Sequence, residues 1–192
     1  MSKINGLILT GGRSTRMGTD KSQMIYHGKT QRDHLTELLR PYCSVVFWSV
    51  NTTQETELEV AGKLQLRIVD RYDLPGPING ILSAFAYDPA AAWLVVACDM
   101  PLISSKSIDT LVKGRNSAKL ATVFYDSDGQ LPEPLLGIYE PAFGPILQQA
   151  VAEGTYSPRQ ILIQQDIHLL TVPDVRELTN INNPEEREKL GL

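Results

Sequence analysis

The sequence predicts a three-layer α/β/α fold with a mostly parallel central sheet. Short apolar runs alternate with segments of helical pattern along most of the 192 residues, which is the order expected of strand–helix–strand units. One run, AWLVVACDM at 92–100, is apolar without polar alternation, as expected of a strand that is covered on both faces. Because 42% of the residues are hydrophobic and the length is ordinary for one core, we expect a single domain over 1–192.

The first half of the chain contains four expected strands, which are the apolar runs at 3–10, 44–50, 64–70 and 92–100. The expected helix at 30–42 begins at Thr30, and Asp33 follows it at the spacing of a capping box. The expected helix at 77–87 has Pro77 at its first position, where proline is favoured. No element is assigned to 51–63.

In the second half the strict alternation of strands and helices is lost from about Pro132. We therefore expect an antiparallel strand in this half of the sheet. The last helix has Asn183 as its cap and Pro184 just inside it. The expected strands are 119–125, 133–139 and 167–172, with a polar turn at 126–130, and the expected helices are 104–114, 140–154, 157–165 and 183–190.

Composition excludes several classes of partner. The formal net charge is -4, which argues against a general nucleic-acid-binding protein and against an anionic membrane surface. We find no signal peptide and no apolar run of about 18 residues, so we expect a cytoplasmic protein. The two cysteines, Cys43 and Cys98, are not spaced as a metal knuckle or a redox pair, and Cys98 is expected to fill the core.

The stretch LTGGRSTRMGTDK, at 9–21, combines three glycines with three cations directly after the first expected strand. Bare glycine backbone lets N–H groups approach phosphate oxygens, and Arg16 and Lys21 would add positive charge. Five residues separate Gly12 from Gly18, so the stretch is not a P-loop of the GxxxxGK[ST] type. The alternative is a solvated loop whose glycines only permit turns.

Two further segments are expected at the same edge of the sheet as this stretch. The segment from Asp70 to Pro77 follows the third strand, and Cys98 to Pro101 follows the fourth. Ligands of open α/β sheets bind beyond the carboxyl ends of the strands. A carboxylate at Asp99 could hold a divalent cation there, or it could only cap the helix that follows.

The glycine-rich stretch resembles the LAGGxSxRMGxxK signature of nucleotidyltransferases that act on molybdenum cofactor, sugars and related acceptors. Thr10 stands where that family usually has alanine. GPING, at 76–80, resembles the GPLAG element of the molybdenum cofactor guanylyltransferases. CDMP, at 98–101, and NINNPEE, at 180–186, resemble two further motifs of the family, so the resemblance extends over nearly the whole chain.

This resemblance implies a Rossmann-like nucleotidyltransferase fold and a specific reaction. The chain would transfer GMP from GTP to molybdopterin-bound molybdenum cofactor, with release of pyrophosphate. The acceptor phosphate would attack the α-phosphorus in line, assisted by Mg²⁺. The part at about 1–105 would bind the nucleotide and the part at about 106–192 the acceptor.

The resemblance also assigns roles to residues. Asp99 would ligate Mg²⁺ and act in catalysis together with Lys21 and Arg16. Independently of the resemblance, Arg159 lies at the start of a late expected helix, where it could meet the acceptor phosphate or lie on the surface. The residues expected to bind the nucleotide are Leu9, Thr10, Gly11, Gly12, Lys21, Asn51, Asp70, Gly76, Pro77, Gly80 and Asp99. The residues expected to bind the acceptor are Asn180, Asn182 and Arg159.

Two other functions remain open from the sequence. The first is a cytidylyl or sugar-phosphate nucleotidyltransferase on the same fold, and the second is a nucleotide-binding protein that does not turn over. The expected partners are the small molecules GTP and molybdenum cofactor, with transient contact to cofactor-delivery proteins or molybdoenzymes and none to nucleic acid or membrane.

Overall fold

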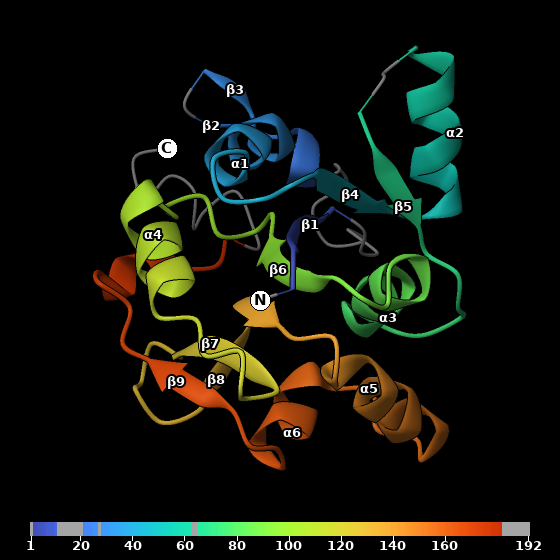
Figure 1. Ribbon diagram of the computed structural model, residues 1–192. Coiled ribbons are helices and arrows are strands. Elements are labelled where there is room, and N and C mark those ends of the chain that lie inside the picture. Colours follow the sequence, from blue (N-terminus) through green and yellow to red (C-terminus); the bar gives the residue numbers. More distant parts are fainter. Residues whose placement is uncertain (1, 11–20, 27, 63–64, 182–192) are drawn as a thin grey trace.

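The computed structural model of the protein describes residues 2–10, 21–26, 28–62 and 65–181, and Figure 1 shows their arrangement. The strands are β1 (Ile4–Leu9), β2 (Ile25–Tyr26), β3 (Lys29–Thr30), β4 (Val46–Val50), β5 (Arg67–Val69), β6 (Ala92–Ala97), β7 (Ala121–Tyr125), β8 (Pro132–Tyr139) and β9 (His168–Leu170). The α-helices are α1 (Gln31–Leu39), α2 (Thr52–Val60), α3 (Ile78–Tyr87), α4 (Ser105–Lys113), α5 (Phe143–Ala152) and α6 (Pro158–Ile163), with short 3₁₀ helices η1 (Lys21–Gln23) and η2 (Val175–Leu178).

Seven strands form one sheet in the order β5-β4-β1-β6-β8-β7-β9. Strands β5, β4, β1 and β6 pair in parallel, as do β7 and β9, whereas β8 runs antiparallel to both of its neighbours. The expected antiparallel strand is therefore confirmed as β8. Because β8 runs the opposite way, it begins at the edge of the sheet where β6 ends.

Helices cover both faces of this sheet, which confirms the predicted three layers (Figure 1). One apolar cluster lies on the face covered by α1 and α4, and it includes Trp48. The other lies on the face covered by α3, α5 and α6, and it includes Trp93. Strand β6 is buried along its whole length, as its unbroken apolar run predicts.

The structure shows how the predicted helix starts and turns compare with the observed ones. Thr30 caps α1, because its hydroxyl accepts a hydrogen bond from the backbone N–H of Asp33 at 3.3 Å. Pro77 lies one position before α3, at the N-cap, and not inside the helix as expected. The polar turn at 126–130 contains Gly129 at a φ of 70°, a left-handed conformation that favours glycine. The expected helix at 183–190 lies outside the described residues.

Helix α2 and the small β2–β3 hairpin were not predicted from the sequence. Leu58 is the single residue of α2 that is buried, so this helix has no apolar stripe from which periodicity could reveal it. A capping signal is nevertheless present. The Asn51 side chain accepts from the Gln54 N–H, and the Gln54 side chain accepts from the Asn51 N–H.

At Gly80, helix α3 packs closely against the sheet. A Cβ at this residue would overlap the Ser49 hydroxyl of β4 and come within 2.9 Å of Leu9 Cδ2 of β1. We expect Gly80→Ala to lower the free energy of unfolding by about 1–3 kcal/mol, because the Ser49 and Leu9 side chains would have to shift and Ser49 would lose its hydrogen bond to Asp70. Urea unfolding would measure this. The control is Ala86→Ser at an exposed position of the same helix, and an equally small loss in both variants would contradict the prediction.

Candidate functional site

The carboxyl ends of β1, β4, β5 and β6 lie along one edge of the sheet, and the start of β8 lies beside them. This edge collects most of the described residues to which the sequence analysis assigned a role. Thr10 follows β1, Asn51 follows β4, Asp70 follows β5 and Asp99 lies two residues after β6. We define this edge as the candidate site.

One half of the site is a network of hydrogen bonds around β4. The Thr10 hydroxyl donates to the Ser49 backbone carbonyl at 2.6 Å, so this hydroxyl, at a position where the family that the sequence resembles usually has alanine, serves the fold. The Ser49 hydroxyl donates to Asp70 Oδ1 at 3.0 Å. Gly80 lies against the same Ser49 hydroxyl. Three residues expected to bind the nucleotide, Thr10, Asp70 and Gly80, therefore all meet at Ser49.

The Asp70 carboxyl is held at the boundary between core and solvent. Burial raises its pKa above the ordinary value, and the hydrogen bond from Ser49 opposes this rise. The raised pKa indicates that burial leaves the charged carboxylate with few solvent contacts. A ligand that donates hydrogen bonds to this carboxylate would therefore be favoured there.

Asn51 lies at the same edge, but its side-chain oxygen is committed to capping α2. The cap also brings Gln54 into the site, where its Nε2 donates to the Thr10 backbone carbonyl at 3.0 Å. The end of β1 and the start of α2 are thereby tied together. Asn51 thus has a structural role that is independent of any ligand.

The other half of the site lies around Asp99. Strand β8 begins beside the end of β6, so Glu133 at the start of β8 comes near Asp99, which lies two residues after β6. Asp99 is half-buried and Glu133 is buried. Burial is the main cause that raises the pKa of the Glu133 carboxyl, and the Asp99 charge contributes in the same direction.

Arg159, at the start of α6, pairs with Glu133 and with a further acid, Asp126. Its Nη2 donates to Glu133 Oε2 at 3.2 Å, and its Nη1 lies 3.6 Å from Asp126 Oδ2. The same arginine lines an open groove of about 610 Å³, whose other walls include Gly76 and Pro77. The structure therefore brings together a predicted nucleotide segment and the predicted acceptor arginine, which are far apart in the sequence.

The C-terminal segment also reaches this half. The Ile181 backbone N–H donates to the Asp99 backbone carbonyl at 2.8 Å, which places the exposed Asn180 next to the site. Lys21 begins η1, but its side chain is not described. The predicted site residues Gly11, Gly12, Arg16 and Asn182 lie outside the described residues.

The donor set around Asp99 can be tested for its fit to a divalent cation. Among the described residues there is no group of three or more side chains that could hold a metal ion by themselves. Both oxygens of Glu133 already accept hydrogen bonds, from the Leu135 N–H at 3.0 Å and from Arg159. A single carboxylate at a site that also binds phosphates suits Mg²⁺, which keeps waters and substrate oxygens as its other ligands. Asp99 fits that arrangement.

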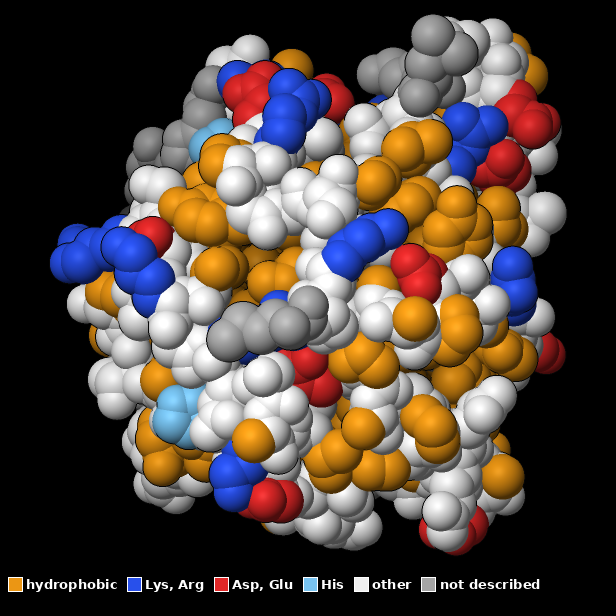
Figure 2. Space-filling view, in the orientation of Figure 1, with side chains coloured by type: hydrophobic (Ala, Val, Ile, Leu, Met, Phe, Trp, Pro, Cys, Tyr) orange, Lys and Arg blue, Asp and Glu red, His pale blue; other side chains and the backbone are white. Residues whose placement is uncertain are grey.

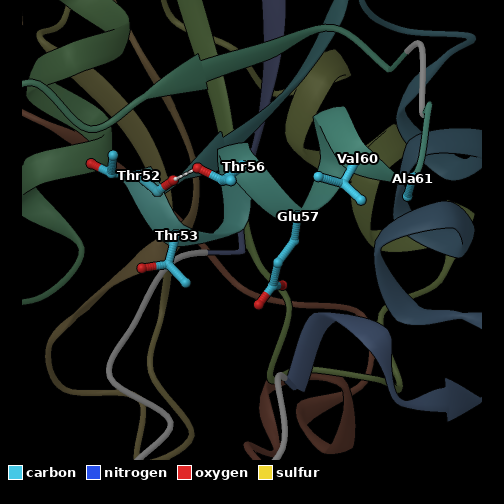
Figure 3. Close-up of a pocket in the computed structure, with 6 residues that line it drawn as sticks. All are labelled: Thr52, Thr53, Thr56, Glu57, Val60 and Ala61. Atoms are coloured by element: carbon cyan, nitrogen blue, oxygen red, sulfur yellow. Dashed lines mark hydrogen bonds between the residues drawn. The ribbon is translucent and has the colours of Figure 1, made fainter.

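A separate hollow of about 550 Å³ lies on α2, outside this edge. It is lined by Thr52, Thr53, Thr56, Glu57, Val60 and Ala61. Figure 3 shows that these residues all come from one helix and its end, and the Thr56 hydroxyl donates to the Thr52 carbonyl at 3.1 Å. No second element contributes polar groups that converge on it, among the residues named, so it lacks the features of a specific ligand site.

Figure 2 shows how the charged side chains are distributed over one face of the molecule. On the face drawn in Figure 2, Lys and Arg side chains are scattered among Asp and Glu and form no continuous basic patch. Within 2–10, 21–26, 28–62 and 65–181, none of the helices has the length and apolar character needed to cross a lipid bilayer.

Sequence reasoning missed two residues of this site, Ser49 and Glu133. Ser49 is a polar residue inside the apolar run SVVFWSV, and Glu133 is an acid that opens the apolar strand PEPLLGIY. Each interrupts an apolar pattern, and this interruption was the available signal.

The chain is similar in sequence to a known protein family and to several named proteins. Residues 6–168 match the family model described as "MobA-like NTP transferase domain". The chain is 36% identical over 185 residues to a Synechocystis protein named "Molybdenum cofactor biosynthesis bifunctional protein", with 95% of this chain but only 52% of that relative covered. It is 32% identical over 182 residues to a Pseudomonas paraeruginosa protein named "Molybdenum cofactor guanylyltransferase", with 93% of this chain and 90% of the relative covered.

Among solved structures, the fold is similar to that of Molybdopterin-guanine dinucleotide biosynthesis protein A from Archaeoglobus fulgidus. The TM-score is 0.79 at 21% identity, and the match covers 96% of this chain and 95% of that one. A synthetase described as CMP:2-keto-3-deoxy-manno-octonic acid synthetase complexed with CTP matches with a TM-score of 0.71 at 15% identity, covering 98% and 97%. Solved structures with this fold therefore include proteins whose names contain guanine and cytidine nucleotides.

Proposed function

Since this chain belongs to the MobA-like NTP transferase family, we propose that it is a nucleotidyltransferase that transfers GMP from GTP to molybdopterin-bound molybdenum cofactor. The acceptor phosphate oxygen forms a bond to the α-phosphorus of GTP, and the bond from that phosphorus to the bridging oxygen breaks, so that pyrophosphate leaves. The observation that carries the proposal is the gathering of Thr10, Asp70, Gly76 and Asp99 at one edge of the sheet, with Arg159 beside them.

Each half of the site has a separate task in this reaction. The half around Ser49 and Asp70 suits the nucleoside, since its polar groups are fixed by hydrogen bonds before a ligand arrives. The half around Asp99 suits the phosphates and the acceptor. Lys21 and Arg16 are proposed to neutralise the triphosphate, because two polyanions must approach each other for the reaction.

Asp99 is the residue proposed to hold the cation, which we propose to be Mg²⁺. When bound, the ion would offset the negative charge of the triphosphate and of the departing pyrophosphate. The protein has little covalent chemistry to perform, since a phosphate oxygen is already a nucleophile. Its residues act by positioning and by charge.

The name "Molybdenum cofactor guanylyltransferase" of similar proteins supports GTP rather than CTP as the proposed substrate of this chain. The test is pyrophosphate release by the purified protein with Mg²⁺, molybdenum cofactor, and either GTP or CTP. We expect release with GTP, and a loss of about 100-fold in Lys21→Ala, by comparison with other donors that stabilise developing negative charge. The control is Lys106→Ala, at an exposed position of α4.

Two results would overturn the proposal in different ways. Faster turnover of CTP than of GTP would show a cytidylyltransferase. Binding of GTP without release of pyrophosphate, in the presence of a competent acceptor, would show a nucleotide-binding protein that does not turn over.

A further inference from the structure

Glu133 is a buried acid in the candidate site to which neither the family motifs nor the sequence analysis assigned a role. Its side chain is 10% exposed and lies at the start of β8, near Asp99. One carboxylate oxygen accepts from the Leu135 N–H at 3.0 Å and the other from Arg159 Nη2 at 3.2 Å. Both oxygens are therefore directed, one toward its own strand and the other toward α6.

Arg159 is held from two sides. Glu133 pairs with Nη2, and Asp126 pairs with Nη1 at 3.6 Å, so neither ion pair uses Nε. The two acids are nearly buried, at 10% and 12% exposed, whereas the arginine is 38% exposed. The acids thus form the fixed base of the cluster, and the guanidinium forms its accessible face, on the groove that Gly76 and Pro77 also line.

A second buried acid on the same strand shows what an ion pair built for stability looks like. Glu140, just after β8, receives two hydrogen bonds from Arg115, at 2.6 Å from Nε and 2.7 Å from Nη2. Both partners of that pair are buried, at 5% and 6% exposed. Glu133 receives a single, longer hydrogen bond, at 3.2 Å, and its partner Arg159 is accessible to solvent. Burying a carboxylate costs free energy in both ion pairs. This difference indicates that Glu133 orients the Arg159 side chain more than it stabilises the fold.

We propose that Glu133 is a positioning residue, which together with Asp126 fixes the Arg159 guanidinium on the groove so that it meets the phosphate of the acceptor. This inference rests on the proposed function. A guanidinium on a flexible side chain loses binding energy when it must be ordered, and a fixed one does not. A small misplacement of such a group can cost about 100-fold in rate.

The test is Glu133→Gln, which keeps the shape of the side chain and removes its charge. We expect KM and Kd for the acceptor to rise about 10- to 100-fold, while KM for GTP stays at the wild-type value. The melting temperature is expected to stay the same or rise, because a buried charge is removed. Arg159→Lys keeps the charge but loses the planar fork, and should reproduce the defect, with the double variant no worse than either single one.

The matched control is Glu140→Gln, which removes an equally buried acid at the other end of β8. It should lower the melting temperature and leave both KM values unchanged. Equal rises of KM for GTP and acceptor in Glu133→Gln, or an unchanged KM and Kd for the acceptor, would overturn the inference. If the wild-type protein binds the acceptor but releases no pyrophosphate, the proposed function is wrong. The acceptor Kd of Glu133→Gln would still decide whether Glu133 positions Arg159.

Discussion

Asp99→Asn is expected to reduce guanylyl transfer by about 100- to 1,000-fold without unfolding the protein. Asparagine has the shape of aspartate but lacks the charge that would hold a divalent cation beside the triphosphate. The backbone carbonyl of Asp99, which accepts from Ile181 N–H at 2.8 Å, is retained in this variant. Pyrophosphate release at saturating GTP and Mg²⁺ measures the loss, and the melting temperature reports that the fold is intact.

The control for this prediction is Asp166→Asn. Its side chain is 71% exposed and pairs with Lys119 near β9, away from the strand ends that form the site. Turnover of this variant should equal that of the wild type. Wild-type turnover in Asp99→Asn would remove Asp99 from the mechanism, and with it the proposed place of the cation.

Arg115→Met is expected to lower the free energy of unfolding by about 3–5 kcal/mol, because it leaves the buried Glu140 carboxylate without its partner. Arg115 also donates to the Ser2 backbone carbonyl at 3.1 Å and to the Ser2 hydroxyl at 2.6 Å. It therefore connects the segment before β1, the segment after α4 and the end of β8. Urea unfolding measures the effect.

Two further variants separate the ion pair from general surface effects. In Arg115→Met with Glu140→Gln, the unpaired charge is removed as well, so most of the lost stability should return. Arg176→Met removes an arginine that is 81% exposed and should change stability by less than about 1 kcal/mol. Because Arg115 lies at the edge of the sheet opposite the site, KM for GTP should not change. A loss in Arg115→Met as small as that in Arg176→Met would contradict the prediction.

Elements with strong local signals were predictable from the sequence. The unbroken apolar run of β6 indicated a strand buried on both faces, and Thr30 marked the start of α1. These signals are carried by residues within a few positions of one another, so no tertiary information is needed to read them. Helix α2 was missed because its stability depends on a cap and on one buried leucine, Leu58, and not on an apolar stripe.

The sequence by itself determined the layered α/β class, the presence of an antiparallel strand in the second half, and the candidate role of Asp99. Only the tertiary structure decided that Ser49 joins Thr10, Asp70 and Gly80, and that Glu133 holds Arg159 on the groove beside Gly76 and Pro77. The physical reason is that these contacts join residues 21 to 39 positions apart in the sequence. They form only once the order of the strands in the sheet is fixed. Such pairs leave no periodic mark in the sequence, because they depend on which strands become neighbours.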